Sequence, residues 1–290
     1  MSNEITTSFV EQYSSNVAML AQQMGSHLRA AVDVESITGK NAFFDQVGVT
    51  AAVERTSRHA DTPQIDTPHS RRRVSLADYE WADLIDDQDK VRALIDPTSS
   101  YAKAAAAAMG RSMDDVIISA LGGSADTGET GSTAVALPAA SKFATGQQSD
   151  GLTIAKMIAA KKFFDLNDVD PSIPRFIACG ATQIADLLGT TQVTSSDFNT
   201  VKALAQGDID TFMGFKFIMT NRLAFDATNT DDRKIFAFTQ DAIKLGIGKD
   251  ITAKIDVRPD KSYATQVYTC MSIGAVRMEE NKVFQIPCDE

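Results

Sequence analysis

Apolar residues recur at helical spacing in several stretches of the chain, and the first lies in residues 1–40. Its apolar stripe consists of Phe9, Tyr13, Val17, Leu20, Met24 and Leu28. Spacings of three and four residues place these side chains on one face of a helix. The pattern predicts an amphipathic helical arm, which packs either on its own domain or on a neighbouring copy of the chain.

Residues 98–121 predict a long helix. Alanine is the best helix former, and it occupies every position from Ala104 to Ala108. A helix of about 24 residues is about 36 Å long, which suits the spine of a domain. Similar periodicity predicts shorter helices over residues 152–165, 181–188 and 240–246, and another from Ser196 to a C-cap at Gly207.

Short runs of β-branched and aromatic residues separate these helices and predict strands. The predicted strands cover residues 175–180, 215–220, 235–239, 251–257, 264–277 and 283–287. Mixed helices and strands without a regular βαβ order indicate an α+β fold.

Residues 43–85 predict a long hairpin, with strands at 47–53 and 73–81 around a polar tip that contains Pro63 and Pro68. A two-stranded ribbon is marginally stable in water. This ribbon has few large apolar residues, so we expect it to lie on another surface, which indicates an oligomer.

Charges are segregated along this hairpin, with arginines on its strands and aspartates just beyond it. The arginines are Arg55, Arg58, Arg71, Arg72 and Arg73, and the aspartates are Asp83, Asp86, Asp87 and Asp89. Opposite charges at two ends of one element suit head-to-tail contacts between copies. The alternative is two charged faces that simply contact water.

The net charge of −10 and the pI of about 4.8 argue against a general nucleic-acid binder, whose affinity comes from Lys and Arg on phosphates. The charge is compatible with a protein that encloses nucleic acid without gripping it. No apolar run is long enough to span a bilayer, and the N-terminus lacks the basic start of a secretory signal. We therefore expect a cytosol-like compartment and no membrane partner.

Candidate chemistry is sparse. Cys179, Cys270 and Cys288 are far apart in sequence and have no neighbouring histidine, so a zinc site is not expected. The glycine-rich residues 122–132 lack a P-loop ending and carry two acidic residues, which predicts a flexible loop. His59 and His69 could face each other across the hairpin as metal ligands. We assign no catalytic, cofactor-binding or metal residues and expect no enzyme, although an α/β enzyme with an unrecognised site remains an alternative.

The segment LAQGDIDTFMGFKFIMTNRL (204–223) resembles the axial-domain core of Hong Kong 97-type phage major capsid proteins. IFAFTQDAIKLGI (235–247) and CMSIGAVRMEENKVFQI (270–286) resemble further axial and final β segments of that family. The order of elements supports the resemblance over essentially the whole chain.

The resemblance implies an N-arm over residues 1–42, an E-loop over 43–90, and an axial domain over 166–256. A peripheral domain with a spine helix would comprise 91–165 and the C-terminal strands 257–290. It further implies pentamers and hexamers that form an icosahedral virion shell around double-stranded DNA, without specific DNA binding. E-loops would lie over adjacent subunits.

Assembly would take place in the host bacterial cytoplasm, with a scaffolding protein, a portal and, in some shells, a decoration protein as partners. Some members of the family form a covalent crosslink through an E-loop lysine. Residues 43–89 contain no lysine, so we expect no such crosslink. The nearness of the N-arm to the start of the chain suggests a separate scaffold or a trimmed mature form. An encapsulin-like protein shell remains an alternative within the same fold.

Overall fold

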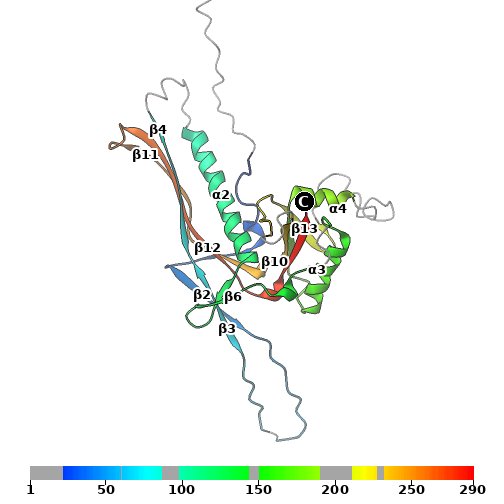
Figure 1. Cartoon of the computed structure of the whole chain (residues 1–290). Helices are drawn as coiled ribbons and strands as arrows, with labels where there is room; N and C mark the ends of the chain where they lie inside the picture. The colour runs from blue at the N-terminus through cyan, green and yellow to red at the C-terminus, as the bar shows by residue number, and fades with distance from the viewer. Residues whose placement is uncertain (1–21, 60, 87–97, 144–149, 190–210, 227–231) are drawn as a thin grey trace, which may run out of the picture.

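A computed structural model describes residues 22–59, 61–86, 98–143, 150–189, 211–226 and 232–290. Within these ranges the chain forms three β-sheets. A long helix lies along one sheet, two shorter helices join another in a compact lobe, and an extended loop leaves the body near the third (Figure 1). Short 3-10 turns connect these elements: η2 (Arg29–Ala31), η3 (Ala139–Ser141), η4 (Gln240–Ala242) and η5 (Glu280–Lys282).

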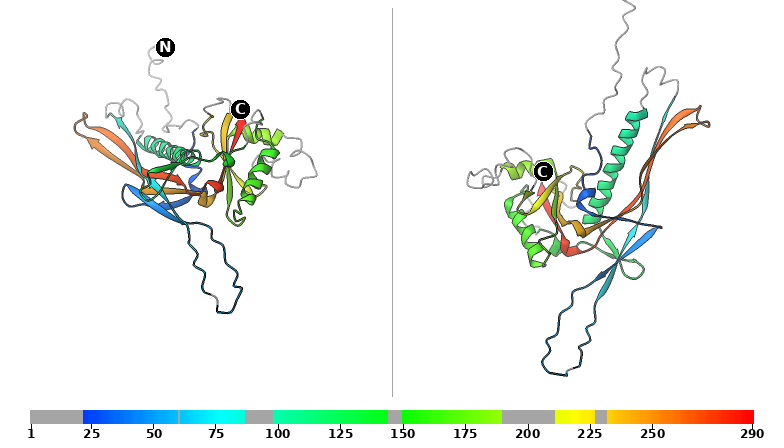
Figure 2. Two further views of the ribbon diagram at one scale, coloured as in Figure 1. Left: turned by 60° about the horizontal axis from the view of Figure 1, so that its bottom comes forward. Right: turned by 180° about the vertical axis from the view of Figure 1, so that it is seen from behind.

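The long helix α2 (Thr98–Gly122) packs against a four-stranded sheet with the order β1-β11-β12-β4 (Figure 2). Its strands are β1 (Asp33–Ser36), β11 (Ile243–Arg258), β12 (Ala264–Arg277) and β4 (Ala77–Ile85). β1 runs parallel to β11, and the other pairs are antiparallel. This sheet therefore brings together strands from the start and the end of the chain.

The compact lobe contains a five-stranded sheet with the order β13-β10-β7-β9-β8. Its strands are β13 (Val283–Asp289), β10 (Asp232–Thr239), β7 (Arg175–Cys179), β9 (Phe215–Met219) and β8 (Thr211–Phe212). Helices α3 (Ile154–Leu166) and α4 (Ala181–Gly189) lie beside it. Thr153 caps α3 by accepting a hydrogen bond from the Lys156 backbone N–H.

One continuous core joins the long helix to the lobe. Met113 and Leu121 of α2 belong to the same buried cluster as Ile273 of β12 and the lobe aromatics Phe164 and Phe215. The burial of these apolar side chains is the main stabilising term. The helix, the first sheet and the lobe are thus packed as one body.

The third sheet supports the extended loop, which comprises residues 48–68. Its order is β2-β3-β5-β6, with β2 (Asn41–Val47), β3 (His69–Ser75), β5 (Ala125–Thr127) and β6 (Thr133–Val135). A small core of Ile37, Val74, Ala125, Val276 and Met278 lies beneath it. β3 crosses β12 so closely that a Cβ on Gly274 would lie 2.2 Å from the Ser75 carbonyl oxygen.

Several predictions from the sequence are confirmed. The helices expected at 98–121, 152–165 and 181–188 are α2, α3 and α4, and the strand expected at 264–277 is β12. The expected strands at 175–180, 215–220, 235–239, 251–257 and 283–287 correspond to β7, β9, β10, part of β11 and β13. The mixed α+β character is also confirmed.

The helical arm is wrong for the part of it that the structure describes. Residues 22–28 are not helical, and the chain continues through η2 into β1. The physical reason is Asp114 of α2, whose carboxylate accepts the backbone N–H groups of His27 and Leu28 and so replaces helical hydrogen bonding there. Leu28 is fully buried in the chain's own core. Residues 1–21 lie outside the described residues.

Further local predictions are corrected. The first hairpin strand is Asn41–Val47 rather than 47–53, because Ala42 and Phe44 pack on the small core whereas Val49 and Val53 are exposed. The second hairpin strand is His69–Ser75 rather than 73–81, because residues 77–85 pair with β12 of the first sheet as β4. Residues 240–246 form η4 and the start of β11, because Ile243 and Leu245 alternate into the core. Residues 122–132 include β5, which pairs with β3 rather than forming only a loop. The helix expected from Ser196 to Gly207 lies outside the described residues.

Candidate subunit-interface surfaces

The three consecutive arginines of β3 hold the root of the extended loop. Arg71 pairs with Asp45 of β2 at 2.5 Å, Arg72 with Glu280 at 2.7 Å, and Arg73 with Asp126 at 2.5 Å. Each pair joins β3 to a different part of the same chain. The hydrogen bond from Arg71 lowers the pKa of Asp45, which keeps that carboxylate charged.

Arg72 differs from its two neighbours because it is buried, with an exposed fraction of 7%. Its guanidinium also donates to the Met278 carbonyl oxygen at 3.0 Å. A buried charge that loses its partner is costly. Reversing Arg71, Arg72 and Arg73 together would therefore disturb folding, because a carboxylate at position 72 would face Glu280.

Arg277 ties this root to the end of α2. Its side chain is fully buried and donates to the carbonyl oxygens of Leu121 at 3.1 Å, Gly123 at 2.6 Å and Val135 at 3.0 Å. Burial lowers the pKa of Arg277, while Glu280, 3.8 Å away, favours its charged form. A cation at a helix C-terminus satisfies carbonyl groups that have no partner within the helix.

The extended loop itself presents apolar side chains to solvent. Val49 is 98% exposed and Val53 62% exposed. Beyond the bond from the Gly48 N–H to the Pro68 carbonyl oxygen, residues 49–59 and 61–67 belong to no strand. Figure 2 shows the loop reaching away from both the sheet and the lobe. Its valines are therefore left largely exposed by the described part of their own chain.

The remaining charged residues singled out from the sequence lie on exposed parts of two elements. Arg55 and Arg58 are exposed on the loop, where Arg55 Nε donates to the Ser57 carbonyl oxygen. Asp83 is half-buried on β4 and Asp86 is exposed just after it. Asp87 and Asp89 lie outside the described residues. Among the described residues, the structure brings neither Arg55 nor Arg58 into an ion pair with Asp83 or Asp86 of the same chain.

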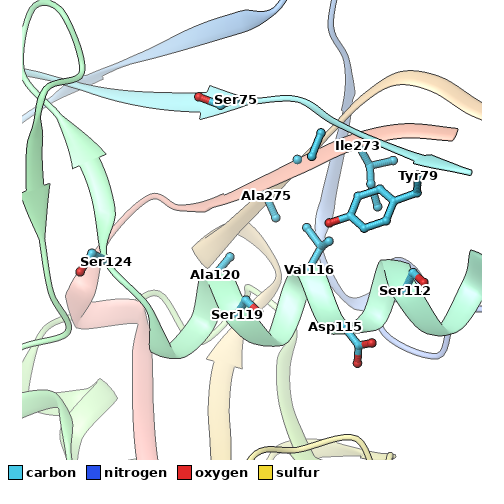
Figure 3. A pocket seen from close by; sticks show the side chains of 12 residues that line it. Ser75, Tyr79, Ser112, Asp115, Val116, Ser119, Ala120, Ser124, Ile273 and Ala275 are labelled. Atoms are coloured by element: carbon cyan, nitrogen blue, oxygen red, sulfur yellow. The ribbon is translucent and has the colours of Figure 1, made fainter.

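β4 is an edge strand of its sheet within the described residues. Edge strands offer unpaired N–H and C=O groups to another chain. Beside β4 runs an open groove of about 430 Å³ between the sheet and α2. Figure 3 shows Tyr79, Ile273 and Ala275 of the sheet facing Val116 of α2, with Asp115 pointing away. Ala77 and Tyr79 of β4 line this groove, so the groove borders the first part of the edge strand.

Sequence reasoning missed Asp114, Arg277 and Glu280, which organise the body around the loop. Asp114 accepts four hydrogen bonds from residues 23–28. Its signal was a carboxylate on the apolar face of a helix, three residues before Ile117. Arg277 ends the apolar strand β12, where a charge also indicates a buried partner.

The described part of the chain holds neither a candidate metal site nor a candidate membrane span among its helices. No three His, Cys, Asp or Glu side chains gather there as a possible metal site. Among the described helices, none has the length and hydropathy needed to cross a membrane.

Comparisons with known proteins agree with this picture. The family described as phage capsid protein matches residues 5–290. No curated protein sequence matches the chain significantly.

Solved phage structures share the fold at low sequence identity. The capsid structure of cyanophage P-SCSP1u has a TM-score of 0.74 at 14% identity and covers 99% of this chain and 94% of its own. A Mycobacterium phage Che8 chain gives 0.72 at 17%, covering 96% and 97%. The capsid of Ralstonia phage GP4 gives 0.73 at 10%, covering 97% and 95%. The expected capsid fold is thereby confirmed, and the chain belongs to the phage capsid protein family.

Proposed function

We propose that this chain is the major capsid subunit that assembles, as pentamers and hexamers, into an icosahedral shell around double-stranded DNA. The observation that carries the proposal is the extended loop, whose root is held by ion pairs and whose apolar side chains are left largely exposed by the described residues. Exposed apolar side chains on an unpaired segment gain free energy when another chain covers them.

The neighbouring copy would supply that cover through its β4 edge and the groove beside α2. Arg55 and Arg58 of one copy would meet Asp83 and Asp86 of the next, with Asp87 and Asp89 adding to the acidic side. Complementary charges fix register and speed encounter. Arg71, Arg72 and Arg73 would contribute chiefly by holding the loop at its root, with Arg71 and Arg73 still partly exposed to a neighbour.

The segments named from the sequence remain proposals with this function: N-arm 1–42, E-loop 43–90, peripheral 91–165 and 257–290, and axial 166–256. Strand pairing joins two of these segments, because β13 of the proposed peripheral segment 257–290 pairs with β10 of the proposed axial segment. Scaffolding protein, portal and decoration protein are proposed partners, and the host cytoplasm is the proposed site of assembly. The net charge of −10 supports enclosure of DNA without specific binding.

Imaging of the purified chain, with light scattering on the same sample, tests the proposal. Closed shells, or rings of five and six subunits, are the expected result. Nucleic acid inside shells from infected cells supports a phage head, whereas protein cargo would indicate an encapsulin-like shell. A chain that stays monomeric with scaffold and crowding agent present would overturn the proposed assembly.

The charge contact can be tested separately with the double variant Arg55→Glu, Arg58→Glu. It should fold as the natural chain does, because both residues are exposed, yet fail to assemble. The matched control Arg55→Lys, Arg58→Lys keeps the charge and should assemble. Adding Asp83→Arg and Asp86→Arg to the Glu variant should restore assembly, and normal shells from the Glu variant alone would refute the contact.

A further inference from the structure

A cluster of polar side chains lies on the face of the first sheet that is turned away from α2. Met271 and Ile273 of β12 point into the main core. Alternation along the strand places Tyr268, Cys270 and Ser272 on the opposite face. There the Tyr268 hydroxyl donates to Glu80 at 2.9 Å, and the Ser272 hydroxyl donates to Asp78 at 2.6 Å. Cys270 thus lies in a polar setting rather than in the core.

Lys249 and Thr252 of β11 both reach the Cys270 sulfur. Lys249 Nζ lies 3.1 Å from Cys270 Sγ, and Thr252 Oγ1 lies 3.3 Å from it. Residues three apart on a regular strand point to opposite faces. Register shifts between Ile247 and Lys249 and between Lys249 and Thr252 place both side chains on the same side. β-bulges of this kind re-aim side chains.

The other two cysteines have a different environment. Cys179 and Cys288 are fully buried, and burial raises the pKa of each thiol to about 12. Hydrogen bonds from Thr252 and Lys249 instead lower the pKa of Cys270, although burial opposes the effect. The hydrogen bond to Glu80 raises the pKa of Tyr268, so the phenol stays neutral. Cys270 retains a 9% exposed fraction beneath the exposed Lys249 and Thr252.

We propose that Cys270 and Lys249 form a reactive thiolate–ammonium pair, which makes Cys270 the site of covalent modification by peroxides. The thiolate attacks one oxygen of hydrogen peroxide, so that an S–O bond forms and the O–O bond breaks with its electrons on hydroxide. The Lys249 ammonium gives this hydroxide a proton. The products are a sulfenic acid at Cys270, water and a neutral Lys249 amine, with sulfur oxidised and peroxide reduced.

The test treats the full native chain with hydrogen peroxide and traps sulfenic acid with a cyclic 1,3-dione. Peptide mass spectrometry then measures the labelled fraction at each of the three cysteines in the same sample, so that Cys179 and Cys288 serve as internal controls. Cys270 should be labelled at least about tenfold faster than either, and the difference should vanish in denaturant. Equal labelling of the three cysteines in the native chain would overturn the proposal.

Variants test the role of the lysine. Lys249→Gln and, independently, Thr252→Val should each slow the labelling of Cys270 by about tenfold, because the thiolate loses a stabilising donor. The control Lys261→Gln removes the same charge from the turn that joins β11 and β12 and should leave the rate unchanged. Thermal unfolding of each variant verifies its fold. Unchanged labelling in a folded Lys249→Gln chain would refute the pair.

Discussion

At the residue scale, a few buried charges define the body from which the loop extends. Arg72, Arg277 and Glu280 join β3, the end of α2 and η5 in one network. Asp114 does the same for the segment before β1. In each case backbone or side-chain partners replace the hydrogen bonds to water that the charged group loses on burial.

Arg72→Ala should lower the free energy of unfolding by about 3 kcal/mol, because Glu280 loses the nearer of its two arginine partners in a mostly buried pair. The matched change Arg71→Ala removes an exposed pair with Asp45 and should leave stability almost unchanged. Chemical denaturation of both variants measures the difference. Equal midpoints would show that burial of Arg72 contributes nothing.

Asp250 gives a pH-dependent contribution. The hydrogen bond from Arg29 lowers the pKa of Asp250 below its ordinary value of 3.8. A depressed pKa means that the stabilisation is present above pH 3.8 and is lost as pH falls through the lower folded value. Asp250→Asn should thus destabilise the chain slightly at neutral pH and flatten the acid limb of its stability curve. Stability curves of the natural chain and of Asp250→Asn that fall equally steeply with acid would contradict this.

At the element scale, periodicity predicted most helices and the late strands because their apolar residues alternate or recur without interruption. It could not place the segment before β1, whose conformation depends on Asp114 of a distant helix. It also misplaced the hairpin strands, because Val49 and Val53 have the spacing of a strand but no core to pack on, and because residues 77–85 pair with β12. The sequence shows where the charged residues of the loop lie along the chain, and their role at an interface stays a prediction. The pairs of Arg71, Arg72 and Arg73 depend on tertiary contacts that the sequence does not reveal.

Gly110 shows how an element depends on its surroundings. Alanine there should stabilise an isolated helix by about 1 kcal/mol. In this fold a Cβ on Gly110 would lie 2.4 Å from the Gly25 carbonyl carbon, so Gly110→Ala should destabilise the chain. Gly189→Ala, at the end of α4, is the control and should be tolerated, because no atom of the described residues lies within 4 Å of the new Cβ. Thermal denaturation compares them, and a higher midpoint for Gly110→Ala would contradict the packing.

At the scale of the whole molecule, the sheet, α2 and the lobe share one core, while the extended loop stands outside it. Proposed assembly through the loop arginines implies dependence on ionic strength. Raising salt from 0.01 M to 1 M shortens the Debye length from about 30 Å to about 3 Å and should slow the rise in light scattering by about tenfold. The Arg55→Lys, Arg58→Lys chain should show the same dependence of the scattering rate on salt concentration. A rate independent of salt would argue for apolar contacts alone.

The anchoring of the loop root also bears on when, during its synthesis, the subunit can associate with another copy of the chain. Arg72 and its partner Glu280 are 208 residues apart, and β1 pairs with a strand more than two hundred residues later. Translation proceeds from the N-terminus, so Arg71 and Arg73 meet their partners Asp45 and Asp126 early. The buried pair of Arg72 with Glu280 forms only after Glu280 has left the ribosome. We therefore expect a subunit with a fully anchored loop only when nearly the whole chain has been made.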